Sequence, residues 1–297
     1  GTVTLFNCRS LILEPSNPLS SFCEVLVVML RCLRNVSLYM VIIGLVGCVP
    51  PGPTSEWTVE DLYEYGQRRY EDENFLRSME AFRILTLNYT TSDLIDDAMF
   101  LLGESHRQMK EYPIAAVTYR RLIRDFPQSP YADDAQYNLA RSVFEQSSGV
   151  SHTQDKTFEA IRELQIFLDE YPDSEVAPDA QNLLQECLDK LAEKDYQIGH
   201  LYFRLQDWEA ARLYFTELID EFPSSKWAIP ARYEIGESFA REENWDDAVM
   251  NLQVFLELYP DHELAPAVKE RLREIVPKSS SAPENAGTDT RITNDLN

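Results

Sequence analysis

The sequence predicts an all-α protein, a superhelical array of five helix pairs with a capping helix at the C-terminal end. From Trp57 to about Pro277 apolar residues recur at the spacing of amphipathic helices, and no long alternating run indicates a strand. A motif ending in an aromatic residue and Pro also recurs, and it ends a helix because Pro disfavours the helical conformation of the preceding residue. The motif occurs at Leu122–Pro127, Phe167–Pro172, Leu218–Pro223 and Phe255–Pro260.

Small residues recur at matching places within each unit. The first helix of each pair carries one where two helices approach closely, at Gly66, Gly103, Ala140, Gly199 and Gly236. Another small residue follows at a fixed distance on the second helix, and an aromatic residue or leucine at a second fixed distance. The third unit keeps this order but holds an insertion within residues 145–156. This register resembles the tetratricopeptide repeat, whose stacked helix pairs bury a continuous apolar seam.

The spacing places each helix in turn. The pairs are expected at 58–73 and 75–88, 93–110 and 112–125, 131–146 and 157–170, 176–205 and 207–221, and 227–243 and 245–258. Residues 264–275 form the capping helix. Residues 277–297 are rich in Ser, Asn, Thr and Pro, and we expect them to be disordered. Trp208 and Trp245, at the starts of second helices, are expected to pack into the core.

The N-terminal residues have the features of a targeting segment. Arg31 and Arg34 precede the apolar run Val36–Val46, which is about half as long as the ~20 residues that a membrane-spanning helix needs. We therefore expect residues 29–47 to be a secretory signal that starts at Met29, and residues 1–28 to be upstream translation without structure of their own. The alternative, a buried core helix, is disfavoured because the basic residues lie on one flank only.

The end of this signal, Leu45–Cys48, resembles the lipobox of bacterial lipoproteins. The resemblance implies cleavage before Cys48 and acylation of its sulfur and its new amine, and a thiolate is a suitable nucleophile for that chemistry. Two or more acyl chains anchor a protein stably. Val49 rather than Asp follows the cysteine, which under the sorting rule of such signals implies the outer membrane. Residues 48–56 then form a lipidated, Pro-rich tether.

Charge and residue spacing exclude several kinds of function. Acidic residues outnumber basic ones by 50 to 27, so the chain repels nucleic-acid backbones. The four His residues lie far apart, with no second ligand at metal spacing. No Ser/His/Asp order and no Gly-rich phosphate loop stands out. The sequence therefore predicts a protein that is not an enzyme and needs no metal or cofactor. Acidic pairs such as Asp96–Asp97 are expected to be solvated charges at helix starts.

Aromatic residues on the first helices form a candidate peptide-binding groove. Three residues before each small-residue position stand Tyr63, Phe100, Tyr137, Tyr196 and Tyr233. One turn beyond that position, on the same helical face, stand Tyr70, Arg107 and Phe144. The rings of the first three repeats would hold an extended peptide, and Arg107 would pair with its terminal carboxylate. The alternative is that the rings only pack between neighbouring helices, which is the favoured interpretation for Tyr196 and Tyr233.

The whole combination resembles the BamD family, the tetratricopeptide-repeat lipoproteins of the outer-membrane β-barrel assembly machinery. The resemblance covers residues 45–276, and Thr157–Pro172 and Tyr196–Ala211 are especially similar. It implies a non-enzymatic subunit that faces the periplasm from the outer membrane. Such a subunit binds unfolded outer-membrane proteins through repeats one to three (57–172). Repeats four and five with the cap (173–276) dock on a BamA-like β-barrel subunit, in company with other assembly lipoproteins.

A second interpretation is a periplasmic tetratricopeptide-repeat protein that coordinates cell-wall synthesis and envelope integrity. Such proteins usually carry a coiled coil ahead of the repeats and an ordinary signal. Here Cys48 ends the signal and no heptads precede Trp57, which favours the lipoprotein.

Overall fold

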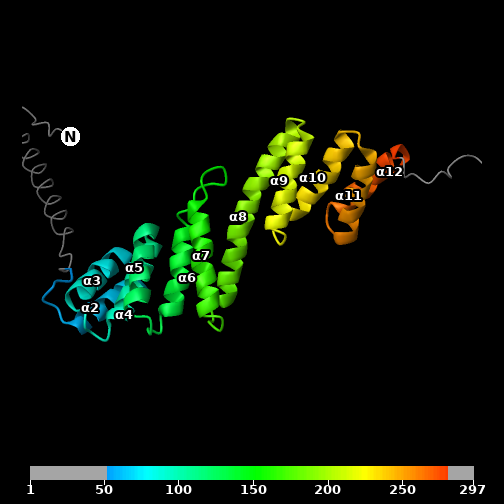
Figure 1. Cartoon of the computed structure of the whole chain (residues 1–297). Helices are drawn as coiled ribbons and strands as arrows, with labels where there is room; N and C mark the ends of the chain where they lie inside the picture. The colour runs from blue at the N-terminus through cyan, green and yellow to red at the C-terminus, as the bar shows by residue number, and fades with distance from the viewer. Residues whose placement is uncertain (1–51, 280–297) are drawn as a thin grey trace, which may run out of the picture. The chain divides into compact units, whose positions relative to one another are not determined.

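The computed structural model describes residues 52–279, and this part of the chain is helical without a strand (Figure 1). The helices are α2 (Val59–Glu71), α3 (Phe75–Asn88), α4 (Ile95–Gln108), α5 (Tyr112–Asp125), α6 (Ala132–Phe144), α7 (Asp155–Glu170), α8 (Ala177–Arg204), α9 (Trp208–Glu221), α10 (Ala228–Arg241), α11 (Trp245–Leu258), α12 (Ala265–Ile275) and the 3₁₀ helix η1 (Val276–Lys278). The predictions for residues 1–28, for the signal 29–47 and for Cys48 fall outside the described residues and stay predictions.

Each helix packs mainly against its neighbours in the chain. The pairs are α2–α3, α4–α5, α6–α7, α8–α9 and α10–α11, and α12 covers α11. The predicted all-α array of five helix pairs with a capping helix is therefore confirmed, and the observed helix ends fall within about two residues of the predicted ones. First helices of successive repeats also touch one another, at α2–α4, α6–α8 and α8–α10.

The two helices of a pair approach closely where a small residue faces a large ring. A Cβ atom added to Gly103 would lie 2.5 Å from Cε1 of Tyr119, and one added to Gly199 would lie 2.7 Å from Cε1 of Phe215. Both rings are fully buried. The ring fills the space that the missing side chain leaves, which explains the fixed spacing between the two positions in the sequence.

The long helix α8 belongs to two parts of the core. Buried residues from Ala177 to Leu191 belong to the core cluster of α4–α7 and lie next to α6 and α7, whereas Ala192 packs with residues of α9 and α10. The helix therefore serves both as the last layer over the third repeat and as the first helix of the fourth.

The ordered part of the chain extends past its predicted C-terminal boundary. The prediction that residues 277–297 are disordered is wrong for the first three of them, and residues 280–297 lie outside the described part. Lys278 belongs to η1, and its Nζ lies 4.5 Å from the ring centroid of Trp245. Ser279 donates a hydrogen bond to Asp246. The ring and the carboxylate at the start of α11 thus hold the segment that follows α12.

The two tryptophans at the starts of second helices are half-buried, and Trp245 packs against the core of the last repeat as expected. Trp208 lies edge-on to Phe203, with ring centroids 5.1 Å apart. The preceding Asp207 caps α9 by accepting a hydrogen bond from the Ala210 amide.

Candidate functional site

The first helices of repeats one to three present three residues each on one helical face, at positions i, i+4 and i+7. We call these nine residues the first-helix face. They are Tyr63, Gln67 and Tyr70 on α2, Phe100, Glu104 and Arg107 on α4, and Tyr137, Arg141 and Phe144 on α6. All six residues that the sequence singles out belong to this face.

The leading ring of each triplet packs against the aromatic core of its own repeat and stays partly exposed. The ring pairs are Tyr63–Phe82, Phe100–Tyr119 and Tyr137–Phe167, with centroids 6.0, 6.1 and 6.2 Å apart. Phe100 also stacks on Tyr131 at 4.8 Å. The rings therefore pack between helices, as the alternative interpretation expects, and each stays partly exposed.

Arg107 is held by a carboxylate of its own helix. Its Nε and Nη2 donate to the two oxygens of Glu104, at 3.1 and 2.7 Å. The same carboxylate accepts hydrogen bonds from the hydroxyls of Tyr119, at 2.5 Å, and Tyr70, at 3.4 Å. The side chains of Arg107 and Glu104 are only 18% and 10% exposed. The carboxylate pairing that the sequence suggested for Arg107 is thus already made inside the chain.

The hydrogen-bond donors of this cluster, Arg107 and the two phenols, keep their protons at neutral pH. The hydrogen bonds to Glu104 raise the pKa of the Arg107 guanidinium, so it stays positive. Burial, and then the Glu104 charge, raise the pKa values of the Tyr119 and Tyr70 phenols, which therefore stay protonated and can donate. The cluster ties α2, α4 and α5 together at the second repeat.

Repeats four and five carry the corresponding triplets on α8 and α10. Tyr196 lies against Trp227 and Phe215, with centroids 5.0 and 5.6 Å away, as the packing interpretation expects. On α10 the carboxylate of Glu237 accepts from Arg241 at 2.7 Å and from Arg271 of α12 at 2.8 Å. This second buried carboxylate fastens the capping helix to the last repeat.

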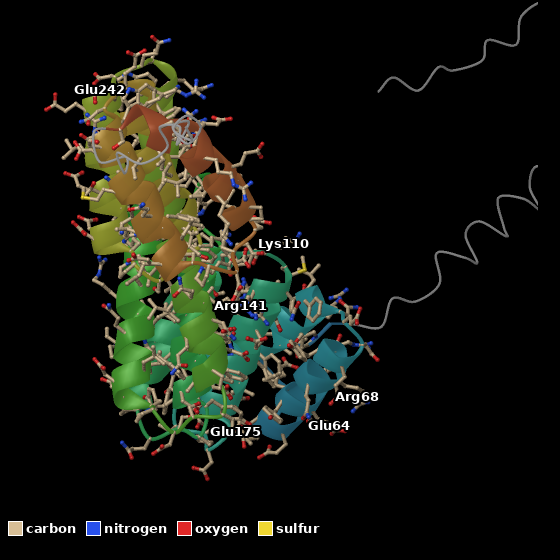
Figure 2. The ribbon with its side chains drawn as sticks, turned by 90° about the vertical axis from the view of Figure 1, so that its right-hand side faces the viewer. Glu64, Arg68, Lys110, Arg141, Glu175 and Glu242 are labelled. Carbon is tan, nitrogen blue, oxygen red and sulfur yellow. The ribbon has the colours of Figure 1, made fainter. Side chains whose placement is uncertain are left out.

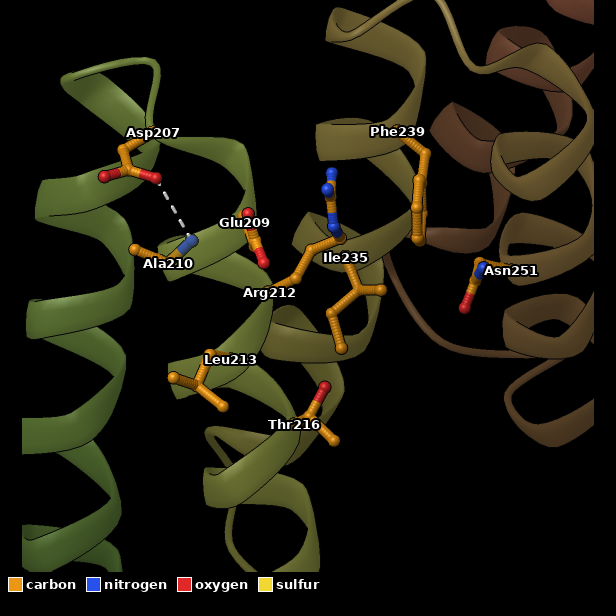
Figure 3. A pocket seen from close by; sticks show the side chains of 9 residues that line it. All are labelled: Asp207, Glu209, Ala210, Arg212, Leu213, Thr216, Ile235, Phe239 and Asn251. Atoms are coloured by element: carbon orange, nitrogen blue, oxygen red, sulfur yellow. Dashed lines mark hydrogen bonds between the residues drawn. The ribbon is translucent and has the colours of Figure 1, made fainter.

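A pocket of about 760 Å³ lies between α9, α10 and α11 (Figure 3). Leu213, which is 56% exposed, and Phe239 contribute apolar walls. The guanidinium of Arg212 lies 4.2 Å from the Phe239 ring centroid and pairs with Glu242 at 2.8 Å. Glu209 adds a further acidic side chain to the lining. The lining thus combines apolar side chains with the carboxylates of Asp207 and Glu209 and the guanidinium of Arg212.

Within residues 52–279 no helix combines the length and hydropathy needed to cross a membrane. The same part of the chain holds no cluster of His, Cys, Asp and Glu side chains arranged to bind a metal ion.

Two models of known protein families match the sequence. The model of the YfiO family, described as outer membrane lipoprotein, matches residues 55–226, more than half of the sequence. The chain belongs to this family of outer membrane lipoproteins. A tetratricopeptide-repeat model matches residues 196–263, which run from α8 to the loop after α11. The YfiO match covers the whole first-helix face and ends just after α9.

Two relatives of this YfiO-family chain share a name. It is 27% identical over 184 residues to the outer membrane protein assembly factor BamD of Caulobacter vibrioides, a match that covers 62% of this chain and 60% of the relative. It is 23% identical to BamD of Rickettsia prowazekii, over 75% of this chain and 90% of that one. Among solved structures, a repeat protein of Bacteroides fragilis is 15% identical with a TM-score of 0.43, covering 73% of this chain and 98% of its own.

Sequence reasoning missed the middle position of each triplet in this YfiO-family protein. Gln67, Glu104 and Arg141 directly follow the small residue of the first helix, and they lie between the two positions that the sequence did single out. Their spacing of four residues from the leading ring was the available signal, because side chains one helical turn apart share a face.

Proposed function

We propose that this lipoprotein is a subunit of the outer-membrane β-barrel assembly machinery. In this proposal repeats one to three bind unfolded outer-membrane proteins, and repeats four and five with the cap dock on the barrel subunit. A lipid on Cys48 anchors the protein to the outer membrane, with the repeats in the periplasm. The relatives named as assembly factor BamD carry the proposal.

Client binding is supported by the composition of the first-helix face. Its rings are partly exposed, and they stand on three consecutive first helices. Aromatic rings give large contact area at low entropic cost, so a row of them suits an extended chain with apolar side chains. An unfolded outer-membrane protein offers such a chain.

Docking through the C-terminal half is supported by the pocket between α9, α10 and α11. A half-exposed leucine beside aromatic and aliphatic walls is the kind of place in which an interface anchors a side chain. The carboxylates of Asp207 and Glu209 in the lining favour a partner surface with basic groups.

The experiment that tests the division of labour compares two matched double variants. Tyr63→Ala with Phe100→Ala removes two leading rings from the N-terminal repeats, and Tyr196→Ala with Tyr233→Ala removes the same two positions from the C-terminal repeats. Each pair loses similar packing, because each ring lies against a buried ring. For each, we would measure the affinity for a C-terminal peptide of an outer-membrane protein and co-purification with the barrel subunit.

The N-terminal pair of substitutions should lower the affinity for the peptide at least tenfold, because each anchoring ring contributes ~1–2 kcal/mol. It should leave co-purification with the barrel subunit intact. The C-terminal pair should leave peptide affinity unchanged. Equal peptide affinity of wild type and the N-terminal pair, with the fold intact by circular dichroism, would show that the rings serve packing alone.

The lipid anchor has its own test. Cys48→Ser should give an uncleaved or soluble protein that takes up no labelled fatty acid, because the hydroxyl cannot replace the acylated sulfur. Equal labelling of wild type and variant would place the lipid elsewhere.

A further inference from the structure

The middle positions of the five triplets differ in their charge and in their partners. They are Gln67, Glu104, Arg141, His200 and Glu237. The two glutamates are neutralised within the chain, Glu104 by Arg107 and Glu237 by Arg241 and Arg271. Arg141, marked in Figure 2, forms no salt bridge with any carboxylate of residues 52–279. Among the charged middle positions of residues 52–279, Arg141 is therefore the one without a carboxylate partner.

The surroundings of Arg141 are aromatic and polar. It stands on α6 between Tyr137 and Phe144, one turn from each. The Arg141 charge acts on the nearby Tyr137 phenol. Burial raises the pKa of that phenol, and the Arg141 charge opposes the rise. The charge of Asp179 on α8 adds to the rise in the pKa of that phenol, and Asp179 forms no salt bridge with Arg141.

A second cation stands at the same end of the face. Nζ of Lys190 on α8 lies 5.2 Å from the Phe144 ring centroid, and its hydrogen-bond partner is the uncharged hydroxyl of Ser147. The third-repeat end of the first-helix face thus combines two rings with two positive charges that have neutral partners.

We propose that Arg141 binds the C-terminal carboxylate of the client peptide, with Tyr137 and Phe144 on either side of the last side chain. The inference rests on the proposed client binding and assigns to Arg141 the role that the sequence suggested for Arg107. A guanidinium presents parallel N–H groups that match the two oxygens of a carboxylate, so it recognises this group by geometry as well as by charge. Lys190 adds positive potential without a fixed geometry.

This placement also sets the direction of the bound chain. The carboxylate end lies at repeat three, and the preceding residues run back over α4 and α2, where the leading rings continue the apolar surface. The Glu104 cluster in the middle of that path carries a charge already cancelled by Arg107, so it does not repel a peptide of either sign.

The test compares two forms of one synthetic peptide on the detergent-solubilised full-length protein. The peptide alternates apolar and polar residues and ends in phenylalanine, with either a free carboxylate or a carboxamide at its terminus. Affinities are measured by fluorescence anisotropy for wild type, Arg141→Gln, Arg141→Lys and the control Arg162→Gln. Arg162 is an exposed residue of α7 without a salt bridge among the described residues.

Wild type should bind the carboxylate form about tenfold more tightly than the amide, the size of one charge-assisted contact at a partly exposed site. Arg141→Gln should bring the ratio to about one, Arg141→Lys should restore part of it, and Arg162→Gln should keep it. Added salt should reduce the wild-type ratio.

The outcomes separate the two proposals. Failure of wild type to bind either peptide would overturn client binding itself. Equal wild-type affinity for both peptides, or an unchanged ratio in Arg141→Gln, would overturn the role of Arg141 and leave client binding standing. If Arg141→Gln does not fold, the wild-type ratio and the Arg141→Lys ratio still decide.

Discussion

Replacing Glu104 by Gln tests whether the buried cluster of the second repeat stabilises the array. The carboxylate accepts four hydrogen bonds, two from Arg107 and one each from Tyr119 and Tyr70. An amide of the same shape has one acceptor oxygen and presents an N–H₂ group to donors. The substitution therefore leaves the Arg107 guanidinium without its counter-charge and turns hydrogen bonds into donor–donor contacts.

The expected loss follows from the burial of the pair. Removing one partner of a buried ion pair costs about 3–5 kcal/mol. Because Arg107 is 18% exposed and reaches some solvent, we expect a loss of about 2–4 kcal/mol for Glu104→Gln. Adding Arg107→Gln should recover part of it, since the uncompensated charge is then gone.

The assay is urea unfolding followed by circular dichroism, with hydrogen exchange of α4 as a local readout because repeat arrays can unfold in parts. Glu64→Gln is the control, since Glu64 pairs with Arg68 at 2.7 Å with both side chains mostly exposed (Figure 2). It should cost no more than about 0.5 kcal/mol. Equal losses for Glu104→Gln and Glu64→Gln would refute the reasoning.

Three further substitutions probe packing, backbone and pH. Gly199→Ala should lower the free energy of unfolding by about 1–2 kcal/mol, because the added Cβ would lie 2.7 Å from the buried ring of Phe215. The control Gly149→Ala, whose added Cβ has its nearest neighbour at 3.8 Å, should change that free energy by less than about 0.5 kcal/mol in the same urea assay. Lys110→Gly should raise the melting temperature, by the equivalent of about 0.5–1 kcal/mol, because Lys110 has a φ of 60° that glycine adopts without strain; a lower melting temperature would contradict this. Burial raises the pKa of Glu234 to about 7, so the native carboxyl holds its proton where the unfolded one has lost it. Its contribution is therefore largest below about pH 4.5 and falls as pH rises towards 7. Glu234→Gln should flatten the fall in stability between pH 5 and pH 8, by about 1–3 kcal/mol, and an unchanged profile would argue against it.

The helix pairs could be predicted closely because two independent signals mark them. The aromatic–Pro motif ends the second helices, and the matched small and aromatic positions fix how each pair meets, as at Gly103 and Tyr119. The turns within pairs carried no such signal. Lys110 and Gln206 take up positive φ although neither is glycine, because the two packed helices determine the turn between them.

The site could be predicted in position and only partly in chemistry. Periodicity placed Tyr63, Phe100 and Tyr137 on one face, since that depends on the helix alone. Which cation is available depends on partners from other helices. Glu104 is three residues from Arg107 in sequence, but the hydroxyl of Tyr119 on α5 helps to hold that carboxylate in place, and only the folded structure brings it there.

The sequence places the end of the ordered chain too early, for a similar reason. The Ser-rich composition after Pro277 indicates disorder, but Lys278 contacts the ring of Trp245 on a preceding helix. Local composition cannot report a contact with a residue so far back in the sequence.

Affinity purification of the native, detergent-solubilised protein, with identification of the proteins that accompany it, tests the central claim most directly. A subunit of the barrel assembly machinery should co-purify with a large outer-membrane β-barrel protein. The Cys48→Ser variant should be recovered from the membrane fraction in smaller amounts than wild type. Recovery of cell-wall synthases without any β-barrel protein would contradict the account.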